Sequence, residues 1–289
     1  MIEQVKRKSM VIRPSGRSSD FISPSFGHGC LYDCSYCYMK RNKPQGLSIA
    51  TNTLEILTAI DHHAWFAEVE KPNQTHEKYV TYDISCNEDF ALHAKYHEWG
   101  TIFEFFKNHP IAMGTLATKY VNNKLLDFNP EKKIRIRFSL MPESYRQTLE
   151  PNTNTIYERL VAVHTFLNAG YEVHLNFSPV IVHEGWLEEY DRLFQVINYM
   201  ATAFEWPKNS EIKSEVIFLT HSTSKHLDNV QNKTPGEFML WKPEIQQQKT
   251  SSFGGDNLRY KNGLKDQYIK EWTKLYNSQL DWMPIRYIF

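Results

Sequence analysis

Hydrophobic residues recur along the chain in two alternating spacings, which predict strands and helices in turn. Apolar and β-branched runs are typical of strands, and 134–140 alternates strictly between apolar and polar residues. Six segments are strand candidates, at 21–26, 79–84, 112–118, 134–140, 172–179 and 214–220. Apolar residues three and four positions apart predict helices at 53–69, 91–108, 155–168, 187–204 and 266–276.

The order of these elements predicts the fold class. Strands that alternate with helices of this length form parallel βαβ units. Six such strands favour an α/β fold, an incomplete (β/α)6 TIM-like barrel, with a C-terminal extension. A Rossmann-like open sheet is the alternative, but no Gly-x-Gly-x-x-Gly follows any strand candidate.

Polar stretches suggest the domain boundaries. Residues 1–20 are polar and are expected to form a loose lead-in, and 21–225 hold the predicted barrel. Residues 226–289 are expected to be an extension that packs on the barrel. Across this boundary, 221–252 is rich in Gln, Lys, Ser and Pro and predicts a loop. A final helix and a strand at 285–289 follow.

Composition and charge narrow the class of protein. The 289 residues include 33 Lys and Arg and 33 Asp and Glu, so the formal net charge is zero, which excludes a strongly basic nucleic-acid coat protein. Hydrophobic residues make up 41% and charged residues 23%, as in globular domains. No apolar run reaches the roughly 18 residues of a membrane span, and the charged N-terminus lacks the apolar region of a signal peptide. We therefore expect a soluble, cytoplasmic protein with no membrane partner.

The cysteines are the most specific chemical feature. Cys30, Cys34 and Cys37 form a Cys-x3-Cys-x2-Cys segment, and Cys86 stands apart. Zinc completed by His28 is one interpretation, since structural zinc sites usually have four ligands. The other is a [4Fe–4S] cluster, which is normally held by four thiolates, so that three ligands leave one iron open for chemistry.

Polar or reactive residues follow the strand candidates. In a β/α barrel, catalytic residues gather at the carboxyl ends of the strands. The cysteine segment follows the first strand candidate, and each of the other five is followed or ended by such a residue: Cys86, Lys119, Ser139, Ser178 and His221. This pattern predicts a single active site at the carboxyl-terminal end of the barrel strands.

The cysteine spacing, with an aromatic residue just before the third cysteine, resembles the radical S-adenosylmethionine superfamily. Further stretches resemble its spore photoproduct lyase branch over about residues 25–289, in the family's order and with similar spacing. They are Cys-Ser-Tyr-Cys-Tyr-Met at 34–39, Ser-Cys-Asn-Glu-Asp at 85–89, and the segments 118–120, 135–139, 169–171, 178–186 and 220–221.

The resemblance implies a (β/α)6 barrel with a [4Fe–4S] cluster and S-adenosylmethionine as cofactors. Reductive cleavage of S-adenosylmethionine gives a 5′-deoxyadenosyl radical in this family. The radical abstracts a hydrogen atom from a thymine photoproduct in DNA, whose flipped bases enter the barrel mouth and are repaired to two thymines. Expected partners are damaged DNA and an electron donor such as flavodoxin or ferredoxin; the oligomeric state is not predicted.

The resemblance also assigns roles to individual residues. It makes Cys30, Cys34 and Cys37 the cluster ligands and Cys86 the hydrogen-atom donor to the product radical. Tyr36 and Tyr38 flank the third cysteine and match tyrosines that relay the radical in the family, and Tyr36 is also expected beside the cofactor. The resemblance further implies contacts to S-adenosylmethionine for Lys119, Ser139 and Ser178.

Two positions depart from the family pattern. Glu88 stands where the family has a small hydroxyl residue, and we expect its carboxylate to bind the cofactor's ammonium or ribose. Ser222 and Thr223 replace an arginine–aromatic pair that the family uses on DNA. Two alternatives to DNA repair therefore stay open. One is a radical enzyme of the same branch with another nucleic-acid, peptide or small-molecule substrate, and the other is a non-enzymatic zinc or iron–sulfur protein.

Overall fold

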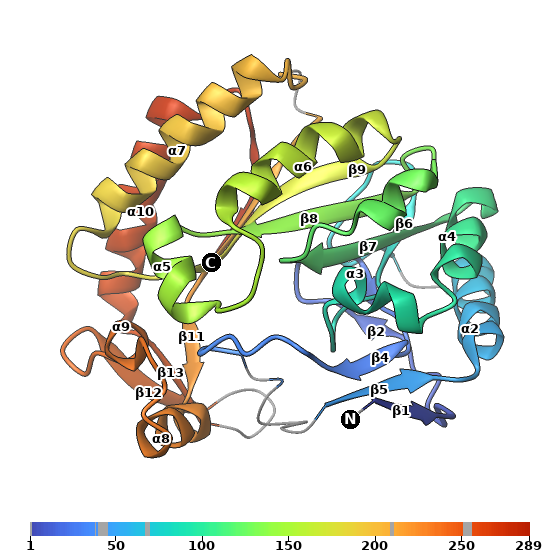
Figure 1. Cartoon of the computed structure of the whole chain (residues 1–289), viewed down its shortest axis with the longest axis horizontal. Helices are drawn as coiled ribbons and strands as arrows, with labels where there is room; N and C mark the ends of the chain where they lie inside the picture. The colour runs from blue at the N-terminus through green and yellow to red at the C-terminus, as the bar shows by residue number, and fades with distance from the viewer. Residues whose placement is uncertain (1, 38, 40–45, 67–69, 209–210, 251–255) are drawn as a thin grey trace. The chain divides into compact units, whose positions relative to one another are not determined.

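The computed structural model describes the whole chain except residues 1, 38, 40–45, 67–69, 209–210 and 251–255 (Figure 1). The chain divides into two compact units whose segments interleave along the sequence. Unit 1 comprises Met1–Leu31, Lys43–Phe138 and Val161–His174, and unit 2 comprises Tyr32–Asn42, Ser139–Leu160 and Leu175–Phe289. The domain boundaries expected from composition stay a prediction.

Unit 1 contains a mostly parallel sheet. Its strands follow the order β8 (Ile134–Leu140), β7 (Ala112–Thr118), β6 (Val80–Asp83), β3 (Phe21–Ile22) and β2 (Arg13–Pro14). All neighbours are parallel except β2 and β3. The predicted strands at 112–118 and 134–140 are confirmed residue for residue, and both are nearly fully buried.

Two expectations for unit 1 were wrong in detail. Only Phe21–Ile22 of the strand predicted at 21–26 is a strand, β3. The next strand, β4 (Gly27–Gly29), begins after the predicted range and joins a different sheet, in which β5 (Leu47–Ala50) lies between β1 (Ile2–Val5) and β4. The lead-in is therefore not loose, because β1 pairs with β5 and β2 pairs with β3.

The helices of unit 1 flank this sheet. They are α2 (Thr53–Phe66), α3 (Phe90–His93) and α4 (Trp99–Asn108), with short 3-10 turns at Ala94–Tyr96 and Asn123–Asp127. Figure 1 shows α2 beside α4. The single helix expected at 91–108 is broken at His97, whose extended backbone (φ −100°, ψ 158°) ends the first segment.

Unit 2 is built around three parallel strands in the order β9 (Glu172–Val180), β10 (Ser214–Phe218) and β14 (Ile285–Ile288). Strands β8 and β9 and helix α6 (Ile156–Asn168) have residues in both units. Helices α7 (Trp186–Ala203) and α10 (Asn262–Gln279) lie side by side (Figure 1). Their aromatic side chains pack on β9 in one cluster of Phe177, Tyr190, Phe194, Trp272 and Tyr276.

The polar segment expected to be a loop at 221–252 is largely structured. It contains the end of β11 (Thr220–Ser222), then α8 (Thr223–Gln231), α9 (Glu237–Leu240) and β12 (Gln246–Thr250). With β13 (Asp256–Tyr260), strands β11 and β12 form an antiparallel sheet. Strand β12 buries only Gln246 fully, so its sequence needs no hydrophobic alternation, and composition gave no signal for it.

In the described part of the chain, no helix is long and apolar enough to cross a membrane.

Candidate functional site

The cysteine segment begins directly after β4. Gly29 has a left-handed backbone (φ 110°), which glycine adopts without strain, and its N–H donates to the carbonyl of Asn87 (3.0 Å). Cys30 follows in unit 1 and is half-buried. In unit 2, the Cys37 N–H donates to the Cys34 carbonyl (3.0 Å), so these two cysteines share one turn. The sequence thus places three thiols within eight residues, and two of them lie on one hydrogen-bonded turn.

The turn between Cys34 and Cys37 is fixed from several sides by contacts to Ser35. The Ser35 N–H donates to the carbonyl of Leu149 (2.9 Å), and its hydroxyl donates to the carbonyl of Pro235 (3.1 Å). Its own carbonyl accepts from the Asn229 side-chain amide (2.8 Å). Residues about 115 and 200 positions away therefore hold the cysteine turn in shape.

A buried polar network links Tyr36 to the end of β8. The Tyr36 hydroxyl donates to the Glu150 carboxylate. Glu150 in turn pairs with Arg159 (2.9 Å), and Arg159 donates to the carbonyl of Ser139 (2.7 Å). Tyr38, the other predicted relay residue, lies outside the described residues.

The two serines predicted to contact S-adenosylmethionine lie on neighbouring parts of unit 2. Ser139 is buried in β8, and its hydroxyl lies 3.5 Å from the side-chain amide of Asn176. Ser178 is half-buried in β9. The structure therefore puts both at strand positions, as the sequence predicts, and their contact with a cofactor stays a prediction.

Cys86 lies just beyond the end of β6, in a charged setting. Asp83 at the end of that strand pairs with Arg137 (2.7 Å) and accepts the Ser85 N–H (2.8 Å). Burial, and then the charge of Asp83, raise the pKa of the Cys86 thiol to about 11, although Arg13 and Arg137 oppose the shift. Cys86 therefore keeps its S–H bond at neutral pH, as a hydrogen-atom donor requires.

Asp89 connects the Cys86 loop to Lys119. Its carboxylate caps α3 by accepting the Leu92 N–H (3.1 Å), and it also accepts from the Thr118 hydroxyl (2.7 Å) and the Lys119 N–H (2.9 Å). Because one side chain fixes both segments, Lys119 and the Cys86 loop are set relative to each other within unit 1.

Glu88 is held inside unit 1 by two histidines. Its side chain is 1% exposed, and Oε2 accepts from His93 Nδ1 and His97 Nε2, both at 2.9 Å. Burial acts to raise the pKa of Glu88, but the two imidazoles outweigh it and lower that pKa. The other nitrogen of His93 accepts the Leu31 N–H (3.3 Å), directly after Cys30. The predicted contact of Glu88 with the cofactor stays a prediction.

Sequence reasoning missed several of these supporting residues. The signals were present for some of them, since Asp89 stands at a helix start and His93 and His97 are four residues apart. Glu150 and Asn229 gave no local signal, because their partners in the cysteine turn, Tyr36 and Ser35, lie more than 100 positions away in the sequence.

A basic hollow of about 530 Å³ lies near the N-terminal strands of unit 1. Its lining includes Lys6, Arg7, Lys8 and Arg13, together with His28, which the zinc interpretation requires as a ligand. The Arg7 side chain donates to the carbonyls of Ser25 (3.2 Å) and Ser48 (2.8 Å), and these hydrogen bonds fix its position in the lining of the hollow.

An α/β fold with a Cys-x3-Cys-x2-Cys loop after the first strands is what the radical S-adenosylmethionine class of protein is expected to have, and solved structures of the same fold confirm the predicted fold class. A model of the spore photoproduct lyase family matches residues 4–288. The chain belongs to the spore photoproduct lyase family, which confirms the resemblance.

Relatives and solved structures agree with this assignment. The chain is 26% identical over 196 residues to a spore photoproduct lyase of Bacillus subtilis (strain 168), covering 66% of this chain and 55% of the relative. A Geobacillus sp. (strain Y412MC61) spore photoproduct lyase is 26% identical over 195 residues, covering 65% and 54%. The chain thus spans about half the length of the curated relatives it matches.

The solved structures establish the fold. A spore photoproduct lyase complexed with dinucleoside spore photoproduct has a TM-score of 0.85 at 18% identity, covering 100% of this chain and 82% of that chain. A variant with bound AdoMet (S-adenosylmethionine) and dinucleoside spore photoproduct gives 0.86 at the same identity and coverage.

Proposed function

We propose that the chain is a radical S-adenosylmethionine lyase that repairs a thymine photoproduct in DNA. Membership of the family over residues 4–288 is the observation that carries this proposal. The three-cysteine loop and the protonated Cys86 thiol support it, because the reaction needs both a cluster with an open iron and a hydrogen-atom donor.

The donor set fits a [4Fe–4S] cluster better than a closed zinc site. Cys30, Cys34 and Cys37 supply three thiolates, which is one fewer than a closed zinc site or a closed cluster needs. Three thiolates do suit a [4Fe–4S] cluster that keeps one iron open for chemistry. The hydrogen bonds to Ser35 hold the turn that two of them share. When bound and reduced, the cluster together with S-adenosylmethionine supplies the 5′-deoxyadenosyl radical that takes a hydrogen atom from the substrate.

The residues of this chain then control where hydrogen atoms go. Cys86 gives its S–H hydrogen to the carbon radical that remains after the bond between the two bases has broken. Tyr36 and Tyr38 are assigned to return a hydrogen atom toward the cofactor. A phenol that loses an electron also releases its proton, and for Tyr36 the Glu150 carboxylate already accepts the hydrogen bond along which that proton would move.

The remaining predicted residues are assigned to binding S-adenosylmethionine. Lys119, Ser139 and Ser178 lie at or near strand ends, where ligands of β/α barrels bind. Glu88 is assigned to the same cofactor through its Oε1 atom, which is buried and has no hydrogen-bond partner in the described part of the chain. A flavodoxin or ferredoxin is assigned as the electron donor.

The basic hollow supports an anionic partner such as damaged DNA. With a net charge of zero, the chain has no global attraction for phosphate, so binding must rest on local groups. Lys6, Lys8 and Arg13 line this hollow and supply such charge. We expect salt to weaken DNA binding with a shallow slope, because few phosphates are neutralised.

The test is anaerobic incubation of reconstituted, reduced protein with synthetic dinucleoside photoproduct. We expect conversion of the photoproduct to two thymidines, and Cys86→Ala should still cleave S-adenosylmethionine while losing clean product. The lyase assignment fails if S-adenosylmethionine is cleaved but no thymidine forms. The radical assignment itself fails if no 5′-deoxyadenosine forms.

A second candidate is a radical enzyme of the same branch with a different nucleic-acid, peptide or small-molecule substrate. One observation favours it: Ser222, at a position where the family pattern has a DNA-contacting pair, caps α8 by accepting the Lys225 N–H (3.3 Å). That side chain is thereby used inside the fold. Cofactor cleavage without photoproduct repair in the same assay would support this candidate.

A further inference from the structure

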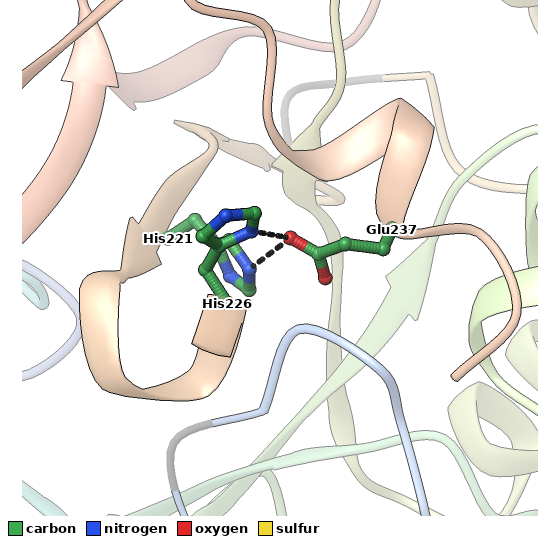
Figure 2. A group of neighbouring side chains, drawn as sticks. All are labelled: His221, His226 and Glu237. Carbon is green, nitrogen blue, oxygen red and sulfur yellow. Dashed lines mark hydrogen bonds and ion pairs between the residues drawn. The ribbon is translucent and has the colours of Figure 1, made fainter. Parts of the chain in front are cut away.

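Two histidines and a glutamate converge in unit 2, away from the cysteine ligands in the sequence. His221 lies in β11, His226 in α8, and Glu237 is the first residue of α9 (Figure 2). Glu237 Oε1 lies 3.0 Å from His221 Nε2 and 2.6 Å from His226 Nδ1. All three potential ligand atoms lie within 4.8 Å of one another.

Local backbone features place each of these side chains. Strand β11 is fixed by antiparallel pairing, with His221 opposite Leu258. Gly236 precedes α9 with a left-handed backbone (φ 83°), and a Cβ there would overlap the Leu149 side chain. Glycine at this position therefore lets the chain turn so that Glu237 points at the two imidazoles, as Figure 2 shows.

A second layer of contacts supports the carboxylate. Asn229, which is buried, donates from its side-chain amide to Glu237 Oε2 and also to the Ser35 carbonyl. The His221 side chain is fully buried, whereas that of His226 is 22% exposed. The cluster is thus closed on the side of His221 and open to solvent on the side of His226.

The donor set has a recognisable chemistry. Two imidazole nitrogens and one carboxylate oxygen are a common protein ligand set for Zn²⁺, with a fourth position left for water. Carboxylates that bind metals are themselves usually hydrogen-bonded, as Glu237 is by Asn229. Nδ1 of His221 is buried with no hydrogen-bond partner in the described part of the chain, so the contact at Nε2 alone orients this ring.

We propose that His221, His226 and Glu237 form a binding site for a divalent transition-metal ion, with zinc as the preferred occupant. Ligand atoms of a tetrahedral zinc ion lie about 3.4 Å apart, at bond lengths of about 2.0–2.2 Å. The two nitrogen–oxygen pairs must therefore open by only about 0.4–0.8 Å, and the one-turn helix α9 can supply that movement.

The ion would join three successive elements of unit 2. It would tie β11, α8 and α9 together and so hold Asn229, which binds the carbonyl between Cys34 and Cys37. Ser35 is held by Pro235 as well, two residues before Glu237. A structural role for the metal in shaping the cysteine turn rests on the proposed function, whereas metal binding itself does not.

The test separates this site from the cysteines. Full-length protein carrying Cys30→Ser, Cys34→Ser and Cys37→Ser is stripped with a chelator and titrated with Zn²⁺, and with Co²⁺ to follow its visible absorption. We expect one ion per chain. In the same background, Glu237→Gln and His226→Ala should weaken binding at least tenfold. The control His62→Ala removes an exposed histidine of unit 1 and should change nothing.

Other results would overturn the proposal. If no ion binds, or if Glu237→Gln and His226→Ala bind as tightly as their parent, the three side chains form a hydrogen-bonded cluster only. Circular dichroism checks that each variant is folded. A further measurement needs no variant of the site. The thermal midpoint of the protein with the three serine substitutions should rise with added Zn²⁺, and an unchanged midpoint also counts against the site. Failure of the lyase assay would not affect these readouts.

Discussion

The hydroxyl of Tyr36 donates a hydrogen bond to the carboxylate of Glu150, which also pairs with Arg159. Burial, and then the negative charge of Glu150, raise the pKa of Tyr36 well above its ordinary value. The phenol therefore keeps its proton across the physiological range. Because the side chains of Glu150 and Arg159 are 1% and 0% exposed, the cysteine turn is anchored to a fully buried ion pair.

Removal of the Glu150 carboxylate should destabilise unit 2 strongly. Glu150→Ala leaves the Arg159 charge buried without its carboxylate partner, and we expect the free energy of unfolding to fall by about 3–5 kcal/mol. Tyr36→Phe removes one hydrogen bond to a charged group and should cost about 1–3 kcal/mol. Urea unfolding at pH 7, followed by circular dichroism, measures both changes.

A surface ion pair of the same unit provides the control. Arg192 pairs with Glu189, and the Arg192 side chain is 62% exposed, so Arg192→Ala should cost less than about 1 kcal/mol. If Glu150→Ala cost no more than Arg192→Ala, the buried pair would not anchor the turn.

The close approach of Gly27 to Glu88 predicts a coupling between these two positions. A Cβ at Gly27 would overlap the Glu88 carboxylate, which is itself pinned by His93 and His97. Gly27→Ala should therefore lower the free energy of unfolding by about 1–3 kcal/mol. In a Glu88→Ser background the obstruction is gone, and the same change should cost much less.

A double-mutant cycle at Gly27 and Glu88 measures this coupling by chemical unfolding of four proteins. Gly16→Ala is the control, because a Cβ at Gly16 meets nothing within 4 Å. Equal costs of Gly27→Ala in the two backgrounds would show that Glu88 does not occupy the space beside β4.

The histidine partners of Glu88 also predict how stability depends on pH. The pKa of Glu88 in the folded protein lies below its ordinary value of 4.5, because the imidazoles overcome the effect of burial. Such a carboxylate stabilises the folded state above the unfolded pKa, and this contribution is lost as the pH falls through the lower, folded value. The stability difference between wild type and Glu88→Gln should thus be largest above about pH 5 and shrink in more acidic buffer. Unfolding curves recorded from pH 7 down to pH 3.5 measure this difference, and a gap that widens with acid would refute the assignment.

Hydrophobic pattern predicted the buried strands well. The bounds of β7, a mostly apolar run, and of β8, which alternates between apolar and polar residues, need no tertiary information. It failed where structure depends on partners. Strand β5 is four residues long and forms between β1 and β4, and β12 exists because β13 pairs with it. The strand propensities of the residues themselves do not reveal which strands will pair.

The candidate site shows the same division. Chain-local spacing revealed the three-cysteine loop, and resemblance pointed to Cys86 and Lys119. The side chains that orient these groups are fixed by long-range contacts. Asp89 reaches Lys119 across 30 positions, and Asn229 reaches Ser35 across 194. Such contacts follow from the fold as a whole, so they became visible only in the structure.

The protonation state of Cys86 can be measured directly. With a folded pKa of about 11 against an ordinary value of 9.0, the thiolate fraction at pH 8 should be roughly a hundredfold smaller in the native protein than in the unfolded chain. Anaerobic iodoacetamide labelling, with the Cys86 peptide quantified by mass spectrometry, should show a rate that rises with pH up to about 11. The urea-unfolded chain, labelled in parallel, should level off near pH 9, because burial and the Asp83 charge no longer act on the thiol. A native profile with its midpoint at 9 would show that burial and the Asp83 charge do not raise the pKa of the Cys86 thiol.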